Sequence, residues 1–502
     1  MARRKASRHR YTSAEAGISR AAKHSRDMGR RTKTEIGIGI LALALCVAGC
    51  TAPQSDVEKP AEVKEETGEV RTLTLAFEAP TRARLAEDRV TPLWEVGDEI
   101  LLWGVENSKE TVRLKAEDIE ETEGGANCAR ISTSLEGTIY AVYPAEAVSD
   151  FSGWLGSVTL KIPSSTDGSF EQAHIAVSRS EGDKMFFRNA VSILEFKKVD
   201  ERVKSIEMSY SGRYSTYDVT IGDELEFSNY SSTGSEMIKM TRMTAGKPVY
   251  LPVVPGAKIP AEAVFTFRDA KGSVLRRMTH SSALTPEVNW IYGLGAAEPA
   301  TAPAGAVSGA FSVSDSRQVF FAEANLQSTG SFASDQTASG GLFTEAEEFG
   351  IWRSITADEL NYLFSGRTSA AGTAPTIAGT ANAIYLKCTV DSICGLLLFP
   401  DAFEWPSGIE DSKASCANDW TADFSSATFG SDEFATLEAA GCVFLPAAGF
   451  RSGGNTYNVG SQGYYLTSTD VVLSFHADGL SYTGENKDPN IAQSLRLVTD
   501  AF

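Results

Sequence analysis

Short runs of alternating apolar and polar residues fill the chain from residue 71 to residue 295. In the run TLTLAFEA, Leu73, Leu75 and Phe77 occupy every second position. Comparable runs, separated by turn residues, recur at 99–105, 137–144, 158–163, 192–199, 203–210, 248–256, 263–269 and 289–295. A period of two, with no helical period of useful length between the runs, predicts an all-β region folded as an antiparallel sandwich.

The pattern changes after residue 310 to a mixture of strand and helix periods. FSVSDSRQVFFAEANLQ predicts one or two strands, and AIYLKCTVDSICGLLLFPDAF predicts a hairpin. Thr356 and Glu359 form a capping box at the start of a helical apolar stripe. A second helix is predicted around SDEFATLEAAG, with Ser431 as its cap and Gly441 at its end. Residues 310–502 are therefore expected to form an α+β domain.

An apolar run from Ile36 to Ala48, behind a basic flank, is typical of a secretion signal. It is shorter than the roughly 20 residues that span a bilayer. The run ends in Val47-Ala48-Gly49-Cys50, which resembles the lipobox of bacterial lipoproteins. The resemblance implies cleavage before Cys50 and a diacylglycerol on its sulfur, which anchors the protein to the outer membrane. Because the residues before Met28 are basic and polar, Met28 is the expected start, and residues 1–49 are excluded from the fold.

Two further segments have no apolar period. Residues 50–70 are rich in Glu, Lys and Pro and predict a disordered tether. Residues 296–309, AAEPATAPAGAVSG, predict an extended linker. The expected domains are therefore a β-sandwich region at 71–295 and an α+β domain at 310–502.

The charge of the chain argues against two classes of partner. The chain holds 46 Lys and Arg residues against 65 Asp and Glu residues, a net charge of −19. Residues 1–49 contain 11 of the basic and 3 of the acidic residues, so their removal leaves a net charge of −27. Such a surface repels nucleic acid and anionic lipid, so neither is an expected partner.

Seven cysteines are present, of which Cys46 lies in the signal and Cys50 at the lipidation position. The odd number that remains excludes a complete set of intrachain disulfides and leaves the pairing open. Cys388 and Cys394 could bridge the predicted hairpin only across a loop with an odd number of residues, since a two-residue turn places them on opposite faces. No Cys or His spacing predicts zinc. The five cysteines after the signal are Cys128, Cys388, Cys394, Cys416 and Cys442.

Five motifs follow one another in the β region. They are Thr81-Arg82, the run from Trp94 to Ile100, Tyr140-Ala141-Val142-Tyr143-Pro144, the run from Phe187 to Phe196, and the run from Tyr250 to Gly256. In this order they resemble the fimbrillin-like superfamily of major and minor fimbrial subunits. The resemblance implies a surface lipoprotein of two β-sandwich subdomains that serves as a pilus stalk, anchor or tip. In stalk members an arginine-specific protease removes the first strand, and a neighbouring subunit's strand fills the groove.

Arg82, Arg84 and Arg89 follow the first predicted strand, where such a cut would fall. The alternative is that they are solvated loop arginines. Removal of a strand exposes an apolar groove and unpaired backbone groups, which another chain covers by strand addition. Other fimbrial subunits are therefore expected partners.

The α+β region carries a second set of motifs. They are Trp352-Arg353, the run from Gly395 to Asp401, the run from Leu437 to Arg451, Gly463-Tyr464-Tyr465, and the run from Gln493 to Val498. They resemble the C-terminal module of the bacterial major-paralogous-domain group, whose fold is similar to C-type lectins and to the formylglycine-generating enzyme. The family usually has Trp after Gly-Tyr-Tyr. Leu466 stands there in this chain, which predicts the loss of a flat aromatic near the loop-rich face.

Catalytic chemistry has little support in the sequence. After residue 49 the histidines are His174, His280 and His476, and no nucleophile-elbow motif accompanies them. The copper-binding Cys pair of the formylglycine-generating enzyme has no match, and no acidic run matches a calcium loop. No catalytic residue, metal or cofactor is expected.

Aromatic residues in predicted loops and strand ends are the candidates for ligand binding, since flat rings pack on the apolar faces of sugars. The candidates are Trp420, Tyr457 and Tyr464. The alternative is that such rings fill the core, as expected of Trp352 and Trp405.

Together these features predict a lipid-anchored, surface-exposed adhesion protein without enzymatic activity, whose ligand is a glycan or a protein. A fimbrial tip or accessory subunit is favoured over a stalk subunit, because a bulky C-terminal domain hinders donation of a C-terminal strand. One alternative is a surface glycan-binding lipoprotein that never polymerises. The other is a divergent hydrolase or oxidase in the C-terminal domain, which would need a polar pocket holding His476 or a Cys pair.

Overall fold

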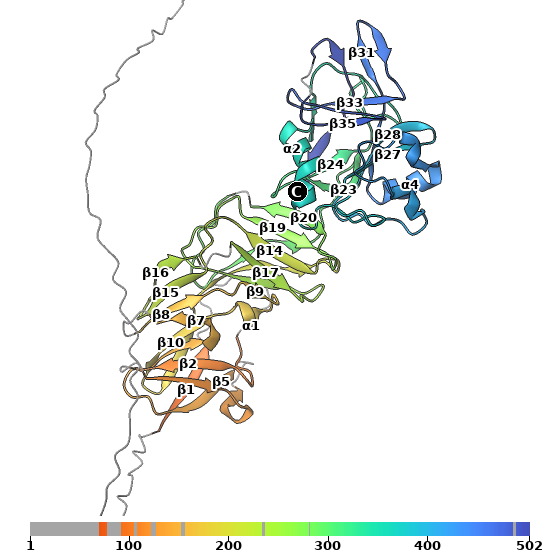
Figure 1. Ribbon diagram of the computed structural model, residues 1–502. Helices are drawn as coiled ribbons and strands as arrows, with labels where there is room; N and C mark the ends of the chain where they lie inside the picture. The colour runs from red at the N-terminus through yellow and green to blue at the C-terminus, as the bar shows by residue number, and fades with distance from the viewer. Residues whose placement is uncertain are drawn as a thin grey trace, which may run out of the picture. The chain divides into compact units, whose positions relative to one another are not determined.

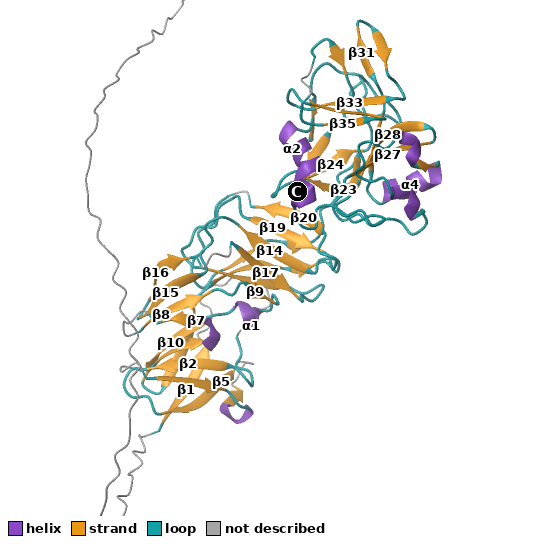
Figure 2. Ribbon diagram, in the orientation of Figure 1, coloured by secondary structure: helices purple, strands orange, loops and turns teal. Residues whose placement is uncertain are grey.

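The computed structural model describes residues 70–77, 92–104, 108–121, 127–151, 156–232, 236–280, 282–484 and 488–501. These ranges belong to one compact unit, Thr67–Phe502, that consists mainly of strands (Figures 1 and 2). The signal with Cys50, the tether before residue 70, and Arg82, Arg84 and Arg89 lie outside the described residues. Among the helices of the described ranges, none has both the length and the apolar character to cross a membrane.

The chain begins with an eight-stranded sheet in the order β3-β2-β6-β10-β11-β1-β5-β4. Alternate residues of its strands pack together in one hydrophobic core, which includes Leu73, Leu75 and Ile131. The core contains the apolar positions of the period-two pattern. The elements are β1 (Arg71–Phe77), β2 (Glu99–Trp103), β3 (Lys109–Arg113), η1 (Ala116–Asp118), β4 (Ile119–Glu121), β5 (Asn127–Thr133), β6 (Tyr140–Tyr143), η2 (Ala145–Ala147), β10 (Ala176–Glu181) and β11 (Lys184–Asn189).

Four smaller sheets share a second core, in the orders β16-β15-β8-β7, β20-β19-β14-β17-β9, β18-β12-β21 and β13-β22. Phe196 anchors this core, with its ring edge-on to Phe265 at 5.5 Å and to Phe267 at 5.4 Å. The elements are β7 (Val148–Asp150), β8 (Ser157–Lys161), β9 (Ser165–Thr166), α1 (Phe170–Ala173), β12 (Ser192–Phe196), β13 (Lys198–Val199), β14 (Ser205–Ser209), β15 (Thr216–Ile221), β16 (Leu225–Ser231), β17 (Met237–Thr241), β18 (Val249–Val253), β19 (Val264–Arg268), β20 (Val274–Thr279), β21 (Ile291–Gly293) and β22 (Ala296–Ala297).

The prediction of an all-β region is confirmed, and every predicted run contains a strand. The prediction that the strands are antiparallel is wrong at four pairs, because β1 with β11, β12 with β21, β13 with β22, and β9 with β17 run parallel. Strands joined by a tight turn must be antiparallel, whereas strands far apart in sequence can pair in either direction. Periodicity does not distinguish the two.

The segment predicted as a linker, 296–309, carries strands at both ends. It begins with β22, where the buried Ala297 pairs with Val199, and it ends inside β23 (Ala306–Ser312). Strand β23 therefore begins four residues before Ala310, the predicted start of the second domain.

Four sheets form the C-terminal domain, in the orders β23-β24-β37-β26-β25, β29-β27-β28-β30, β32-β31-β36 and β33-β34-β35. Their strands are β23, β24 (Gln318–Ala322), β25 (Glu348–Phe349), β26 (Trp352–Arg353), β27 (Tyr385–Val390), β28 (Ile393–Leu398), β29 (Thr428–Phe429), β30 (Val443–Pro446), β31 (Phe450–Ser452), β32 (Asn455–Tyr457), β33 (Gln462–Leu466), β34 (Val472–His476), β35 (Gly479–Ser481), β36 (Ile491–Ala492) and β37 (Val498–Asp500). The helices are α2 (Ala357–Asn361), the π-helical η3 (Tyr362–Gly366), α3 (Arg367–Ser369), η4 (Asp411–Ala414), η5 (Phe424–Ser426) and α4 (Ser431–Ala439). This domain thus combines strands with short helices.

The predicted capping box at the start of α2 is confirmed. Thr356 Oγ1 accepts a hydrogen bond from the Glu359 backbone N–H at 3.1 Å, and the Thr356 N–H donates to Glu359 Oε2 at 3.0 Å. Leu360, Leu363 and Phe364 follow and are buried in the domain core. The helix is therefore fixed both by its cap and by its apolar face.

Helix α4 ends as predicted, but its N-cap lies one residue before the predicted cap, Ser431. Gly441 takes a φ of +91° after the last turn, a conformation that glycine adopts without strain. The N-cap is Gly430 and not Ser431, and the Gly430 N–H donates to Glu433 Oε2 at 3.1 Å. The Ser431 hydroxyl instead donates to Asp391 Oδ2 at 2.6 Å. The Glu433 carboxylate thus bonds the backbone amide of the N-cap, as the acidic residue of a capping box does.

The hairpin of β27 and β28 turns through two residues, Asp391 and Ser392, whose φ angles are +47° and +71°. A two-residue turn places Cys388 and Cys394 on opposite faces, which excludes a bond between them. Cys388 is buried, Cys394 is half-buried, and all five cysteines in the described part of the chain are free thiols.

Leu466 lies in the core, at 2% exposure, beside Trp352 and Leu497. The prediction that this position faces the loop-rich surface is wrong, because β33 directs the side chain inward. Trp352 is buried as predicted, whereas Trp405 is half-buried and packs edge-on to Phe403 at 6.1 Å.

Candidate functional site

Strand β1 occupies the first candidate site. It pairs in parallel with β11 on one side and antiparallel with β5 on the other, so both of its backbone edges are hydrogen-bonded. Leu73 and Leu75 are fully buried. Removal of β1 would leave an apolar groove between two strands with unpaired backbone groups, which is the geometry that strand addition requires.

Phe77, at the end of β1, packs in an aromatic cluster. Its ring stacks on Trp94 with centroids 4.2 Å apart, and it meets Tyr143 at 5.9 Å and Phe187 at 6.0 Å edge-on. Trp94 Nε1 also donates to the Leu75 carbonyl at 3.2 Å. Three motifs that lie far apart in the sequence therefore meet around this strand.

The beginning of β1 is held by polar contacts. Arg71 forms an ion pair with Asp183 at 2.9 Å and donates to the carbonyls of Gly137 and Gly182. Since Asp183 is 76% exposed, this ion pair contributes at most about 1 kcal/mol. Burial of the leucines and the two backbone ladders therefore hold most of the strand in place.

Two titratable groups lie beside this cluster. His174 stacks on Phe170 at 5.3 Å and also lies 5.3 Å from Phe77, and burial lowers the pKa of its imidazole to about 4. Asp98 Oδ1 accepts a hydrogen bond from the Tyr143 hydroxyl at 3.0 Å, and burial raises the pKa of the carboxyl group. His174 is thus a neutral core residue at pH 7.

Strand β37 forms the second candidate site. It lies between β24 and β26 in the middle of its sheet. Asp500 accepts hydrogen bonds from Arg317 at 2.6 Å and from Arg353 at 2.8 Å. Burial opposes ionisation of Asp500, but these two guanidinium groups hold its pKa below the usual value. Arg353 also binds both oxygens of Glu359, at 2.7 and 2.8 Å.

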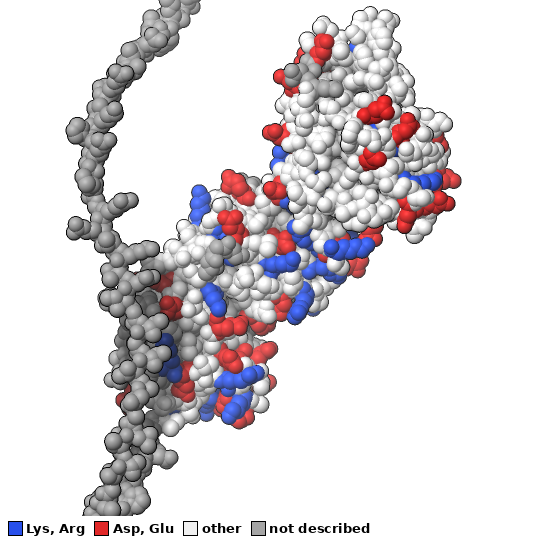
Figure 3. Space-filling view, in the orientation of Figure 1, with Lys and Arg blue, Asp and Glu red and all other residues white. Residues whose placement is uncertain are grey.

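Two of the three predicted ligand-binding aromatics come together in the third candidate site, the aromatic patch of Phe450, Tyr457 and Tyr464. Phe450 stacks on Tyr457 at 5.4 Å and meets Tyr464 edge-on at 5.4 Å. Tyr457 is 44% exposed, and Tyr464 is half-buried with its hydroxyl bonded to Gln462. Figure 1 shows β31 at the end of the domain opposite the C-terminus, and Figure 3 shows a largely uncharged surface there.

Trp420, the third predicted aromatic, is 58% exposed. Its loop is fastened by Lys387, whose buried ammonium donates to the carbonyls of Trp420 at 2.6 Å, Ala477 at 2.6 Å and His476 at 3.0 Å. Burial lowers the pKa of Lys387, opposed by the nearby carboxylates. An exposed indole on a fastened backbone is a suitable contact residue, because little conformational entropy is lost on binding.

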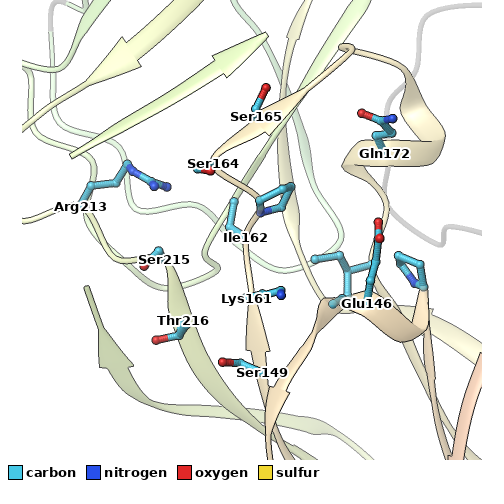
Figure 4. Close-up of a pocket in the computed structure, with 14 residues that line it drawn as sticks. Glu146, Ser149, Lys161, Ile162, Ser164, Ser165, Gln172, Arg213, Ser215 and Thr216 are labelled. Carbon is cyan, nitrogen blue, oxygen red and sulfur yellow. The ribbon is translucent and has the colours of Figure 1, made fainter. Parts of the chain in front are cut away.

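A cavity of about 480 Å³ opens in the β region, near the end of β8 and the start of β15 (Figure 4). Its lining combines apolar residues, such as Ile162, with the charged Glu146 and Lys161. The buried Arg213 also lines it, and its guanidinium points toward the segment that carries Ser164. No aromatic side chain is among its lining residues. The cavity offers hydrogen bonds but no flat ring for a sugar.

The three histidines in the described ranges lie in different surroundings. His476 lies exposed at the end of β34, His280 contacts the Ser282 carbonyl at 2.7 Å, and His174 is enclosed by aromatic rings. Within the described ranges, no group of three His, Cys, Asp or Glu residues is placed to hold a metal ion.

Two functional features escaped the sequence reasoning. Phe450, which joins Tyr457 to Tyr464, is placed by pairing of strands and has no local signal. Lys387 does have one, since a lysine inside the apolar strand YLKCTV must find acceptors for a buried ammonium.

No family model matches the chain, and no curated protein matches it. Solved structures do match. A candidate cell adhesion protein from Bacteroides uniformis is 16% identical at a TM-score of 0.28, over 45% of this chain and 94% of its own. Another from Bacteroides ovatus is 11% identical at 0.29, over 45% and 92%. A fimbrial assembly protein from Parabacteroides distasonis is 11% identical at 0.26, over 51% and 94%.

Proposed function

We propose that the chain is a lipid-anchored adhesion subunit of a fimbria, acting at the tip or as an accessory subunit on the cell surface. The observation that supports this most is the place of β37, which completes the sheet of its own domain and is bound there through Asp500. A subunit inside a stalk must give a strand to its neighbour. A strand that closes its own sheet is not available, so the polymer would end at this subunit.

The place of β1 supports the other half of the proposal. Its two neighbours, β11 and β5, would both gain a free edge if β1 were removed, and the sites of Leu73 and Leu75 would open. Arg82, Arg84 and Arg89 are the proposed cleavage positions after this strand. The chain would then accept a strand but not donate one.

The test treats the purified chain with an arginine-specific protease and adds a fluorescent peptide with the sequence of residues 70–77. We expect the cleaved chain, and not the intact one, to bind this peptide and to remain monomeric in size-exclusion chromatography. A control peptide carrying Leu73→Asp and Leu75→Asp should not bind, because two carboxylates cannot enter the apolar groove. Homopolymers of the cleaved chain, or equal binding of both peptides, would refute the proposal.

Protein recovered from the surface of the producing cell tests the anchor and the maturation together. A lipidated Cys50 followed by an uncut chain through Arg89 would favour the alternative of a surface lipoprotein that never polymerises. A new N-terminus after Arg82, Arg84 or Arg89 would favour the fimbrial subunit.

We propose the aromatic patch as the recognition surface, with a glycan as its ligand. The exposed ring of Tyr457, backed by Phe450, supports this, since stacked rings offer a flat apolar face. Tyr457→Ala should abolish binding on a glycan array. Tyr214→Ala, which removes a ring of 39% exposure in the other domain, should leave binding unchanged.

We also propose that the chain binds without catalysing a reaction. The exposed setting of His476 and the placement of Cys388 and Cys394 on opposite faces support this over the alternative of a divergent hydrolase or oxidase. Turnover of an ester or thiol substrate that is lost in His476→Ala would refute it.

A further inference from the structure

A pocket of about 330 Å³ lies along β20, where this strand meets the turn between β23 and β24. Its lining includes Arg276 and Arg277 from β20, and Arg317, Gln318 and Asp500 from the C-terminal domain. We call it the arginine pocket. Strand β20 is the edge of its sheet, and consecutive side chains of a strand point to opposite faces. A pocket that reaches both Arg276 and Arg277 therefore straddles the sheet edge.

The two arginines of β20 have donors left over. Within the described part of the chain, the Nε groups of Arg276 and Arg277 are buried without a hydrogen-bond partner. Arg277 is 8% exposed, and it uses its Nη1 on the Asp315 carbonyl and its backbone N–H on Gln318 Oε1 at 2.8 Å. Buried donors are rarely left unpaired in native proteins, so the pocket is suited to a ligand that supplies acceptors.

The charges in the pocket favour an anion. Among the lining residues, Arg317 is already balanced, because it pairs with Asp500 at 2.6 Å and with Glu359, outside the lining, at 3.2 Å. The excess positive charge of the pocket is therefore that of Arg276 and Arg277. Outside the lining, the exposed Glu298 is the carboxylate that acts on Arg276. In a chain of net charge −19, a pocket with two arginines in excess is a local exception that attracts anions from solution.

We propose that the arginine pocket binds the carboxylate or sulfate group of an acidic saccharide. A guanidinium presents a fork of N–H donors that matches the two oxygens of such a group. The volume lies at the lower end of small-molecule sites, enough for one sugar unit. The choice of a saccharide as the carrier rests on the proposed adhesive function, whereas the choice of an oxyanion rests on the arginines alone.

Isothermal titration calorimetry at low ionic strength tests this with three probes: sodium glucuronate, sodium sulfate and neutral glucose. We expect glucuronate and sulfate to compete for one site and glucose not to bind. Arg276→Gln should raise the Kd for glucuronate about tenfold or more, because a charge-assisted hydrogen bond is lost. Arg130→Gln, which changes an exposed arginine on β5, should leave the Kd unchanged.

Arg277 is buried, so Arg277→Gln could prevent folding. This variant is therefore titrated only after a thermal unfolding transition has shown that it is folded. Arg276→Gln keeps the test decisive in either case. Absence of binding by both anions, or an unchanged Kd in Arg276→Gln, would overturn the proposal. Binding of sulfate without glucuronate would overturn the assignment to a saccharide and leave the fimbrial role untouched, since that role is tested on β1.

Discussion

Acid should destabilise the region around β1, because the folded protein opposes protonation of one residue, His174. Its ring lies between Phe170 and Phe77, and burial lowers the pKa of the imidazole to about 4. The ordinary pKa in an unfolded chain is 6.5. Above pH 6.5 the ring is neutral in both states. Below it, the unfolded chain binds a proton that the folded chain refuses, so the free energy of unfolding falls until about pH 4.

The size of the effect follows from the two pKa values. The difference between 6.5 and about 4 corresponds to about 3 kcal/mol of unfolding free energy, all of it lost by pH 4. Carboxylates with lowered pKa values, such as Glu207, also lose stabilising interactions in acid. The variant His174→Phe separates the two effects, because it keeps an aromatic ring at the position and removes the titration.

Urea unfolding of the wild-type protein and of His174→Phe, monitored by tryptophan fluorescence between pH 7.5 and 4, measures the difference in their free energies of unfolding. We expect the wild-type protein to lose about 3 kcal/mol more than His174→Phe over this range. Hydrogen exchange of the β1 and β6 amides should show the loss locally, since these strands contact the His174 cluster. Parallel pH profiles of the two proteins would show that His174 is protonated without cost in the folded state and would refute the reasoning.

Three other perturbations test the C-terminal domain. In Gly395→Ala, the added Cβ would lie 2.2 Å from the Phe444 ring, and we expect a loss of about 1–3 kcal/mol in thermal unfolding. Gly408→Ala, with open space around it, is the control. Lys387→Met removes the ammonium that binds three carbonyls and should cost about 3–5 kcal/mol; an unchanged midpoint would show that water replaces it. Iodoacetamide should label the native protein at its partly exposed thiols and spare the buried Cys388 and Cys442, as read by peptide mass; the labelled thiols are Cys128, Cys394 and Cys416.

Local patterns in the sequence predict local structure well. The alternation at Leu73 and Leu75 locates β1, and Thr356 with Glu359 locates the start of α2. Both features depend on residues within one strand or one turn. The cap at Gly430 was missed because glycine has no capping side chain, and the contact at this cap is a hydrogen bond from its backbone N–H to Glu433.

Features that depend on distant residues were not predictable. The parallel partner of β1 is 110 residues farther along the chain in the register Thr74 with Lys184, and no periodicity encodes that choice. The same holds for the meeting of Phe450 with Tyr464. The unpaired Nε groups of Arg276 and Arg277 are buried where β20 contacts residues of the C-terminal domain, and no local pattern predicts that contact.

The place of β37 also sets the order in which the C-terminal domain can fold. Strands β24 and β26 are joined only through it, so residues 498–500 must be present before the five strands become one sheet. If the chain emerges with its N-terminal end first, β23 and β24 form long before β37. Until almost the whole domain has followed, β24 has one unpaired edge. Such an edge invites pairing with other chains. If the chain is exported, as proposed above, its export should therefore depend on a chaperone or on rapid release. Truncation by only a few residues should be more harmful than the loss of any surface loop.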